Sequence, residues 1–340
     1  MMRAIRIHGQ EDMRVEEVPT PEAGPGQVRL RMAWAGVCGS DLHYFFEGAN
    51  GAFQVAEPLV PGHEVSGYVD DDPSGHLAPG TPVTVHPATF GECTPGLEDH
   101  PHLWPRGAYL GSASTWPHTQ GGMSEYLVVE DGMVRVLPTG LSVRDAALAE
   151  PLAVALHAIK VAGGVDGARV LVSGSGPIGL LVAAGALASG AVLVASSDVL
   201  TGPLRRAQDL GVHATFRVGV DEVPDESFDV VFECSGVPAA VNAAFRAVRR
   251  AGVVAQVGML SAGPKPIELA ILLSKEAQLR GCFRFRDEID AALNLLARNP
   301  GIARVITHEL PADDVHSAFA TARDSETSGK VLVRLWGAKA

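Results

Sequence analysis

The chain has 340 residues, of which 46% are hydrophobic and 19% are charged, and it contains 38 glycines. This length favours two domains and the composition is typical of a globular α/β enzyme, because one core rarely serves more than about 300 residues. The formal net charge of −12 argues against a nucleic-acid partner, which needs basic patches, and no apolar run reaches the roughly 18–20 residues of a membrane span.

Residues 1–150 are rich in proline and glycine and contain short β-type runs such as QVRLRMAWAGV, HEVSGYV, TPVTV and SEYLVV. Turn-forming residues between short runs of β-formers predict irregular, mostly antiparallel β structure joined by turns.

Within this part, GVCGSDLHY (residues 36–44) places Cys38 beside polar side chains, and VPGHEVSG (residues 60–67) supplies adjacent His63 and Glu64. A thiolate, an imidazole and a carboxylate, at spacings that match no C-x-x-C pattern, favour an open catalytic zinc site with three protein ligands. Asp41 is expected to hydrogen-bond the far nitrogen of His63 and fix its tautomer. A core cysteine and a His–Glu turn are the plainer alternatives.

Glu150 is a fourth candidate ligand, because it precedes a proline inside the apolar stretch LAEPLAVALHA. A carboxylate there is expected to be buried or near a cleft, and burial without a partner is costly, so a nearby cation is predicted. Hinge packing with a backbone partner is the alternative.

After Pro151, apolar strand-like runs alternate with helical patterns, which predicts a parallel sheet covered on both faces. The alternation weakens near residue 285, so the last 55 residues either cap this sheet or return to the first domain.

The apolar run ARVLVSG, the first of the predicted strands, ends in a glycine-rich turn with glycines at 174, 176 and 179. This spacing, between an apolar strand and a helix, is the fingerprint of a dinucleotide-binding turn. A second strand ends at Asp198, where a carboxylate binds the adenosine ribose and repels a 2′-phosphate, favouring NAD over NADP. Arg205 and Arg206 are expected on an exposed helix face; the alternative is that their charge weakens the preference for NAD. The predicted cofactor-binding residues are Gly174, Gly176, Pro177, Ile178, Gly179 and Asp198.

The four cysteines are widely scattered, and the N-terminal segment lacks the apolar stretch of a secretory signal. Scattered cysteines argue against a disulfide framework. A reducing, cytoplasmic location is therefore predicted.

Together these motifs, with QGGMSEYLVV, FDVVFECSG and KEAQLRGCFRFRDE, resemble the zinc-dependent medium-chain dehydrogenase/reductase superfamily along essentially the whole chain. The resemblance is nearest to the polyol dehydrogenase branch. It implies an α/β fold with a GroES-like β domain at residues 1–150 and 286–340. A Rossmann NAD-binding domain, a doubly wound parallel sheet, is implied at residues 151–285.

The resemblance also implies roles for individual residues. Cys38, His63 and Glu64 match zinc ligands, and Glu150 lies close to the metal or exchanges onto it. Ser40 matches the hydroxyl that passes on the substrate proton, His43 matches the imidazole that delivers it to solvent, and Asp41 matches the partner of the zinc histidine.

One segment departs from the family pattern. Relatives usually carry four cysteines that bind a structural zinc, whereas here FGECTPGLEDHPHLW places Phe90, Cys93, Gly96 and Trp104 at those positions. One thiolate cannot close such a site, so a single catalytic zinc is predicted. A replacement site made of Asp99, His100 and His102 is the alternative.

The branch implies oxidation of a secondary alcohol of a sugar acid or polyol to a ketone with NAD, L-idonate being favoured. Arg284 matches an arginine of the substrate cleft that binds a carboxylate or hydroxyls, and Arg286 is expected on the surface. Tyr44 and Ser112 are predicted to line the pocket, with a packing role as the alternative. Alternatives are a sorbitol, xylitol, threonine or simple alcohol dehydrogenase, and, from another class, a non-catalytic dinucleotide-binding regulatory protein. Relatives of this kind assemble as dimers or tetramers, so a homodimer or homotetramer is expected.

Overall fold

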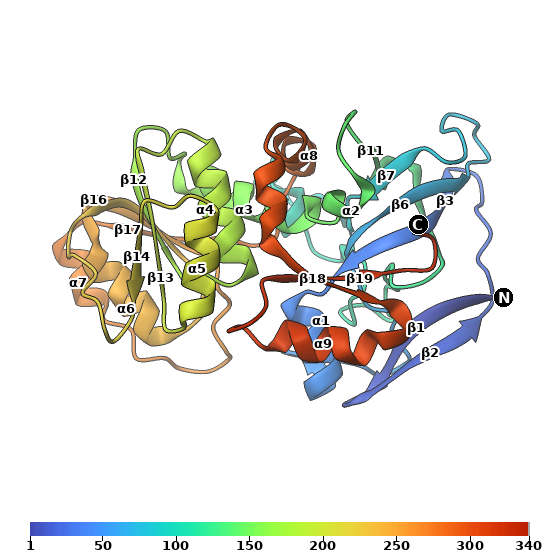
Figure 1. Ribbon diagram of the computed structural model, residues 1–340, viewed down its shortest axis with the longest axis horizontal. Helices are drawn as coiled ribbons and strands as arrows, with labels where there is room; N and C mark the ends of the chain where they lie inside the picture. Colours follow the sequence, from blue (N-terminus) through green and yellow to red (C-terminus); the bar gives the residue numbers. More distant parts are fainter. Residues whose placement is uncertain (339–340) are drawn as a thin grey trace.

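Two large β-sheets organise the chain in the computed structural model, which describes residues 1–338 (Figure 1). A six-stranded sheet occupies the left half of Figure 1 and a seven-stranded sheet the right half, with helices between them. Both chain ends lie in the right-hand half. The predicted α/β class is therefore confirmed.

The six-stranded sheet is entirely parallel and follows the alternation predicted after Pro151. Its strands, in spatial order, are β14 (Ala214–Arg217), β13 (Leu193–Asp198), β12 (Arg169–Ser173), β15 (Phe228–Glu233), β16 (Val248–Gln256) and β17 (Gln278–Gly281). Because β13 and β15 flank β12 on opposite sides, the strand order reverses there, which is where ligands bind in doubly wound sheets.

Helices cover both faces of this sheet, as its apolar strands require. Along β12, Val170 and Val172 pack into one core and Leu171 into the other, because successive strand residues point to opposite faces. The first core includes residues of α3 (Ala149–Ala162), α4 (Pro177–Ala188), α5 (Thr201–Asp209) and α8 (Ile289–Arg298), and the second includes residues of α6 (Pro238–Ala247) and α7 (Leu269–Ser274).

The seven-stranded sheet is mostly antiparallel and combines both ends of the chain. Its strands are β11 (Val134–Val136), β7 (Pro82–Val85), β6 (Glu64–Asp71), β3 (Gln27–Gly36), β19 (Lys330–Arg334) and β18 (Ile306–Pro311), with β10 (Tyr126–Glu130) also paired to β3. Strand β19 pairs with β3 antiparallel and with β18 parallel. Most of the C-terminal segment therefore returns to the seven-stranded sheet, while α8 packs on α3, which covers the parallel sheet. The residue boundaries given above stay predictions.

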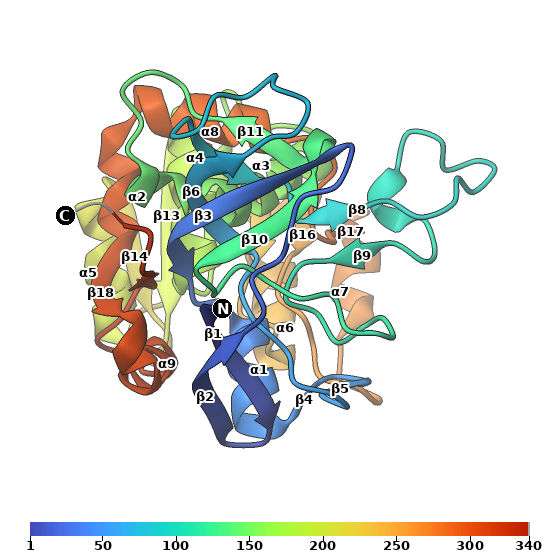
Figure 2. The ribbon, with the colours of Figure 1, turned by 90° about the vertical axis from the view of Figure 1, so that its right-hand side faces the viewer.

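Short elements complete the right-hand half. They are the antiparallel pairs β1 (Met2–Gly9) with β2 (Asp12–Val18), β4 (Ala49–Asn50) with β5 (Phe53–Gln54) and β8 (Ala88–Thr89) with β9 (Ala108–Tyr109), the helices α1 (Gly39–Glu47), α2 (Val143–Ala146) and α9 (Val315–Arg323), and short 3₁₀ turns at Pro101–Leu103, Asp131–Met133 and Ala312–Asp314. A further 3₁₀ turn, Pro300–Val305, packs instead on α4, α5 and α8. Residues 90–107, called the lobe below, project from the body between β8 and β9 (Figure 2).

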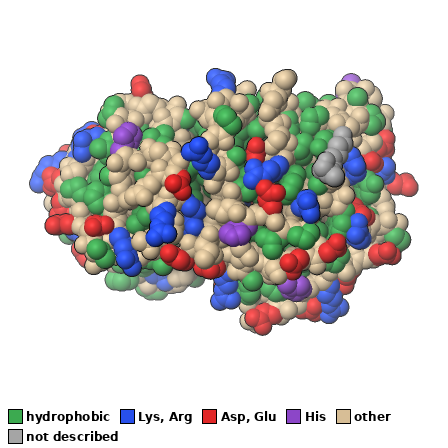
Figure 3. Space-filling model, in the orientation of Figure 1, with side chains coloured by type: hydrophobic (Ala, Val, Ile, Leu, Met, Phe, Trp, Pro, Cys, Tyr) green, Lys and Arg blue, Asp and Glu red, His purple; other side chains and the backbone are tan. Residues whose placement is uncertain are grey.

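Within residues 1–338, no helix combines the length and hydrophobicity needed to cross a membrane. On the face shown in Figure 3, Lys and Arg side chains are interspersed with Asp and Glu rather than gathered into one basic region.

A buried lysine closes the end of helix α6. The Lys275 ammonium donates hydrogen bonds to the carbonyl oxygens of Phe245, Arg246 and Val248, at 2.9, 2.6 and 2.9 Å. The last carbonyls of a helix have no partner within the helix, so this side chain supplies donors that the backbone lacks.

Replacing Lys275 with methionine is expected to lower the free energy of unfolding by about 2–3 kcal/mol, because methionine fills the space and leaves buried carbonyls unpaired. Urea denaturation measures the change. Lys265→Met is the control. Within residues 1–338 the Lys265 ammonium makes one hydrogen bond, at the surface, to the carbonyl of Ala262, so the change in its free energy of unfolding should stay within about 0.5 kcal/mol. Equal effects in the two variants would contradict the capping role.

Candidate active site

Cys38, His63 and Glu64 meet where strands β3 and β6 pair. Cys38 lies just before helix α1, His63 precedes β6, and Glu64 begins it opposite Gly36 of β3. One ligand atom from each of the three side chains lies within 4.8 Å of the others. Sulfur, imidazole nitrogen and carboxylate oxygen at this separation fit a single zinc ion.

Gly36 makes room for the glutamate of this cluster. A Cβ atom on Gly36 would lie 2.0 Å from a carboxylate oxygen of Glu64, so any larger residue would displace this carboxylate from its position. The sequence patterns did not single out this position, although a glycine ending an apolar strand is the signal that marks such a close approach.

Lys330 is a site residue that the sequence analysis missed. Its ammonium donates to both carboxylate oxygens of Glu64, at 2.7 Å each, and to the carbonyl of Val37 at 3.1 Å. Burial disfavours the charged form, but Glu64 and Cys38 raise the pKa of Lys330 above its usual value. A lysine opening the apolar run VLV was the available signal.

Backbone N–H groups hold Asp41 between the two loops that carry the predicted ligands. Its carboxylate accepts hydrogen bonds from the backbone N–H groups of Cys38 (2.9 Å) and Gly62 (3.3 Å). Its predicted hydrogen bond to the far nitrogen of His63 stays a prediction. Asp41 lies in the first turn of α1, where unpaired N–H groups attract a carboxylate.

Asp41 still acts on the site, because it ties the loops that carry Cys38 and His63. Burial opposes protonation of His63, but nearby Cys38, Asp41 and Glu150 raise the pKa of this imidazole well above its usual value. Burial also raises the pKa of Asp41 itself.

The remaining residues of α1 face different surroundings. Ser40 is half-buried, whereas His43 has 52% of its side chain exposed and its Nδ1 lies 2.8 Å from Glu47 Oε1. Tyr44 is buried; its hydroxyl accepts from the N–H of Ala113 at 3.0 Å and lies 3.3 Å from Ser112 Oγ. Tyr44 and Ser112 are therefore brought together, while the proton-transfer roles of Ser40 and His43 stay predictions.

Glu150 is buried in the first turn of α3 and is held by Tyr109, which the sequence analysis also missed. The Tyr109 hydroxyl donates to Glu150 Oε1 at 2.5 Å. Burial raises the pKa of Glu150, and burial together with Glu150 raises that of Tyr109 well above its usual value. Glu150 lies outside the three-residue cluster of atoms within 4.8 Å. Its role as a ligand stays a prediction.

Arg284 lies beside this pair. Its guanidinium carbon is 4.2 Å from the ring centroid of Tyr109 and 5.0 Å from that of Phe283. Its φ of +51° is unusual for a residue with a side chain, so the neighbouring segment must hold it in place.

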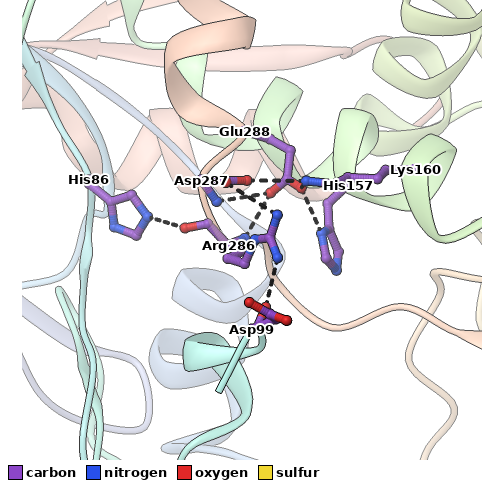
Figure 4. A network of polar contacts seen from close by, with 7 residues as sticks. All are labelled: His86, Asp99, His157, Lys160, Arg286, Asp287 and Glu288. Carbon is purple, nitrogen blue, oxygen red and sulfur yellow. Dashed lines mark hydrogen bonds and ion pairs between the residues drawn. The ribbon is translucent and has the colours of Figure 1, made fainter. Parts of the chain in front are cut away.

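A polar network anchors the segment that follows Arg284 (Figure 4). His86 lies with its Nε2 3.0 Å from the carbonyl oxygen of Arg286, and Glu288 accepts the Arg286 N–H at 2.8 Å. The Arg286 guanidinium donates to the carbonyl of Asp99 in the lobe at 2.7 Å. With 29% of its side chain exposed, Arg286 is a bridging residue rather than the surface residue expected.

The network continues into helix α3. Glu288 lies 3.2 Å from His157 Nδ1 and accepts from Lys160 Nζ at 3.1 Å, as Figure 4 shows. The segment carrying Arg284 is thus attached both to the lobe and to the helix that carries Glu150.

A hydrogen bond and an aromatic contact hold the lobe in place. Trp104 Nε1 donates to the carbonyl of Leu97 at 2.7 Å, and the Phe90 ring packs edge-on against His86. Cys93 is an exposed free thiol, and Gly96 adopts φ +84° in a turn. In residues 1–338, Asp99, His100 and His102 do not form a cluster with metal-binding separations.

The glycine turn follows β12 at the point where the strand order reverses. Gly174 has φ +90°, and a Cβ there would lie 2.9 Å from the backbone nitrogen of Ser235. A Cβ on Gly179 would lie 1.9 Å from the carbonyl oxygen of Gly174. Gly176 and Pro177 begin helix α4, with Ile178 in its first turn. These residues fit a pyrophosphate at a helix N-terminus.

Asp198 ends β13 next to this turn. Its carboxylate accepts from the N–H groups of Ser175 (2.7 Å) and Leu200 (2.9 Å). A cavity of about 460 Å³, lined by Gly174, Asp198 and apolar residues such as Val199, opens beside it. Its size and position suit an adenosine group.

The two arginines near Asp198 differ. Arg205 is exposed, as expected. Arg206 instead donates to the carbonyls of Ser325 (2.6 Å) and Glu326 (3.1 Å), because the C-terminal segment covers that part of α5.

Two protein-family models match the chain. Residues 24–139 match the alcohol dehydrogenase GroES-like domain, and residues 177–298 match the zinc-binding dehydrogenase model. They correspond to the seven-stranded sheet region and to the parallel sheet, respectively.

Characterised relatives cover nearly the whole chain. Sorbitol dehydrogenase of Gallus gallus is 34% identical over 343 residues, 95% of this chain and 94% of the relative. L-idonate 5-dehydrogenase (NAD(P)(+)) of Escherichia coli K12 is 36% identical over 311 residues, 89% of this chain and 90% of the relative.

Solved structures of related dehydrogenases share the fold of the whole chain. The crystal structure of the Escherichia coli K-12 L-idonate 5-dehydrogenase superposes with a TM-score of 0.92 at 32% identity and covers 98% of each chain. A putative zinc-binding dehydrogenase of Sinorhizobium meliloti bound to NADP gives 0.87 at 28% identity, covering 98% of this chain and 99% of the other.

Proposed function

This chain belongs to the zinc-dependent medium-chain dehydrogenase/reductase family, polyol dehydrogenase branch, and on that premise we propose that it oxidises a secondary alcohol of a sugar acid, L-idonate above others, with NAD. It is an alcohol or polyol dehydrogenase with a GroES-like domain and a Rossmann sheet. The choice of substrate and coenzyme is the proposal.

The observation that carries the sugar acid is the free guanidinium of Arg284. No carboxylate within residues 1–338 pairs with it, and its described contacts are the rings of Tyr109 and Phe283. An arginine with its N–H groups unused and its face against aromatic rings is well suited to bind a substrate carboxylate in a bidentate way.

Replacing Arg284 with glutamine is expected to lower kcat/KM for L-idonate about 10- to 150-fold, the effect of losing a charged hydrogen bond of about 1.5–3 kcal/mol. Turnover of sorbitol should fall less than about fivefold, because the glutamine amide can still donate a hydrogen bond to a hydroxyl, whereas it cannot replace the charged bidentate pair with a carboxylate. Steady-state kinetics with L-idonate, sorbitol, xylitol, threonine and a simple secondary alcohol measures both.

Arg298→Gln, which alters an exposed arginine at the end of helix α8, is the matched control and should leave both values unchanged. A wild-type enzyme that prefers sorbitol or xylitol to L-idonate, or an Arg284→Gln variant with equal losses on both substrates, would favour a polyol over a sugar acid.

Cys38, His63 and Glu64 would hold the zinc ion, which when bound supplies a Lewis acid that lowers the pKa of the reacting alcohol. The half-buried Ser40 would accept the alcohol proton, and the exposed His43 would pass it to water. Tyr44 and Ser112 would line the pocket, and Arg284 would orient the substrate by its carboxylate.

For the coenzyme, we propose NAD over NADP on the basis of Asp198. Backbone N–H groups hold both carboxylate oxygens of Asp198 in place. A ribose hydroxyl of NAD can therefore donate a hydrogen bond to this carboxylate, whereas the 2′-phosphate of NADP is repelled by its negative charge. The Asp198→Asn variant removes the charge of this side chain and keeps its shape. The kcat/KM with NAD divided by the kcat/KM with NADP is therefore expected to fall about tenfold or more. An unchanged ratio would contradict this role of Asp198.

One zinc per chain is proposed because the lobe offers a single thiol. Elemental analysis finding two zinc ions per chain would contradict this.

A homodimer or homotetramer is also proposed, supported by the edge strand β17, where Leu279 is 43% exposed. Light scattering measures the assembly. The cytoplasmic location stays a prediction from the scattered cysteines.

A further inference from the structure

Tyr109 joins three parts of the site that come from different segments. Its hydroxyl donates to Glu150 Oε1 at 2.5 Å, its ring centroid lies 5.5 Å from that of His63, and the Arg284 guanidinium lies 4.2 Å above its ring. The residue is buried, and these contacts fix its position.

Glu150 depends on this one hydroxyl. Within residues 1–338, Tyr109 is the only residue that donates a hydrogen bond to Glu150, and the bond uses only one carboxylate oxygen. A buried carboxylate with a single donor has a strong tendency to bind a nearby cation. The cluster of Cys38, His63 and Glu64 is close enough for its charges to act on Glu150, yet Glu150 lies outside it.

We propose that Tyr109 is a positioning residue that holds Glu150 out of the coordination sphere of the metal and so keeps the fourth position open for the substrate. The inference rests on the proposed zinc site. The phenol hydroxyl and the metal compete for the same carboxylate, and a short bond to a charged acceptor favours the phenol. An open fourth position is what a catalytic zinc site requires.

The test is the rate at which zinc passes from the loaded protein to the chelator dipicolinate. In Tyr109→Phe, Glu150 loses its donor and becomes a fourth ligand, so zinc release should slow at least tenfold. In the double variant Tyr109→Phe/Glu150→Gln the carboxylate is absent, and the rate should return to that of Glu150→Gln alone.

Steady-state kinetics supplies a second readout. Because a fourth ligand competes with the substrate in the free enzyme, Tyr109→Phe should raise KM for L-idonate about tenfold while kcat changes less than threefold. A merely structural role of the ring would not give slower zinc release together with a higher KM.

Tyr44→Phe is the matched control for zinc release, since it removes a buried hydroxyl that contacts Ser112 and Ala113 rather than Glu150; it should release zinc at the wild-type rate. The proposal is overturned if Tyr109→Phe, with an unchanged near-UV circular dichroism spectrum, releases zinc as fast as wild type or faster.

It is also overturned if Glu150→Gln alone releases zinc more than tenfold faster than wild type, because Glu150 would then already be a ligand. That second measurement stands even if the tyrosine variant does not fold. Zinc release needs no turnover, so a protein that oxidises no sugar acid refutes the proposed substrate and leaves this comparison intact. A protein that binds no zinc refutes both.

Discussion

Replacing Cys38 with serine should lower kcat/KM for the alcohol by about a thousandfold or more, with zinc content falling well below one ion per chain. A serine hydroxyl is neutral at pH 7 and a poor zinc ligand, so the loss removes several kcal/mol of transition-state stabilisation. Kinetics and elemental analysis measure the two effects.

Coenzyme binding should survive this change. The glycine turn and Asp198 belong to the parallel sheet, whereas Cys38 lies between β3 and α1 of the other sheet. NADH fluorescence titration should therefore give a dissociation constant within about twofold of wild type. Cys93→Ser, which alters an exposed free thiol in the lobe, should change neither activity nor zinc content. Full activity in Cys38→Ser would refute the assignment of the metal site.

Replacing Lys330 with methionine should lower the free energy of unfolding of the metal-free protein by about 3–5 kcal/mol. The Lys330 and Glu64 side chains are 3% and 1% exposed and lie 2.7 Å apart. Removing one member of a buried ion pair leaves the other charge in a medium of low polarity with no counterion. Urea denaturation of the chelator-treated protein measures the loss.

Two further variants separate the ion pair from simple loss of packing. The double variant Lys330→Met/Glu64→Gln removes both charges and should recover most of the stability. Adding zinc should also recover part of the loss in Lys330→Met, because the ion supplies a positive charge beside Glu64. A double variant as unstable as Lys330→Met would show that packing, not charge, accounts for the effect.

The candidate site divides into a part that follows from local sequence and a part that does not. Cys38, His63, Glu64 and the glycine turn each belong to a short motif whose residue types have few other uses together. The turn needs glycine at 174 because its φ is +90°, which is a property of the local chain and so leaves a trace in the sequence.

Contacts between distant segments left weaker signals. Lys330 pairs with Glu64 across 266 positions of the sequence, and Tyr109 pairs with Glu150 across 41. The contacts of Asp41 with the backbone N–H groups of Cys38 and Gly62 likewise depend on two loops that lie about twenty residues apart in the sequence. Arg286 looked like a surface residue until the lobe was placed beside it.

By itself the sequence determined the fold class, the family, the ligand types at the metal cluster and the place of the dinucleotide turn, because hydrophobic period and local motifs encode these over a few residues. The family resemblance also implied that residues 286–340 belong with the first domain. Only the tertiary structure decided that β19 pairs with β3 and β18, that Lys330 neutralises Glu64, and that Tyr109 holds Glu150. Those outcomes depend on which segments pair across long sequence separations, and the free energy of such pairing belongs to the assembled core rather than to either segment alone.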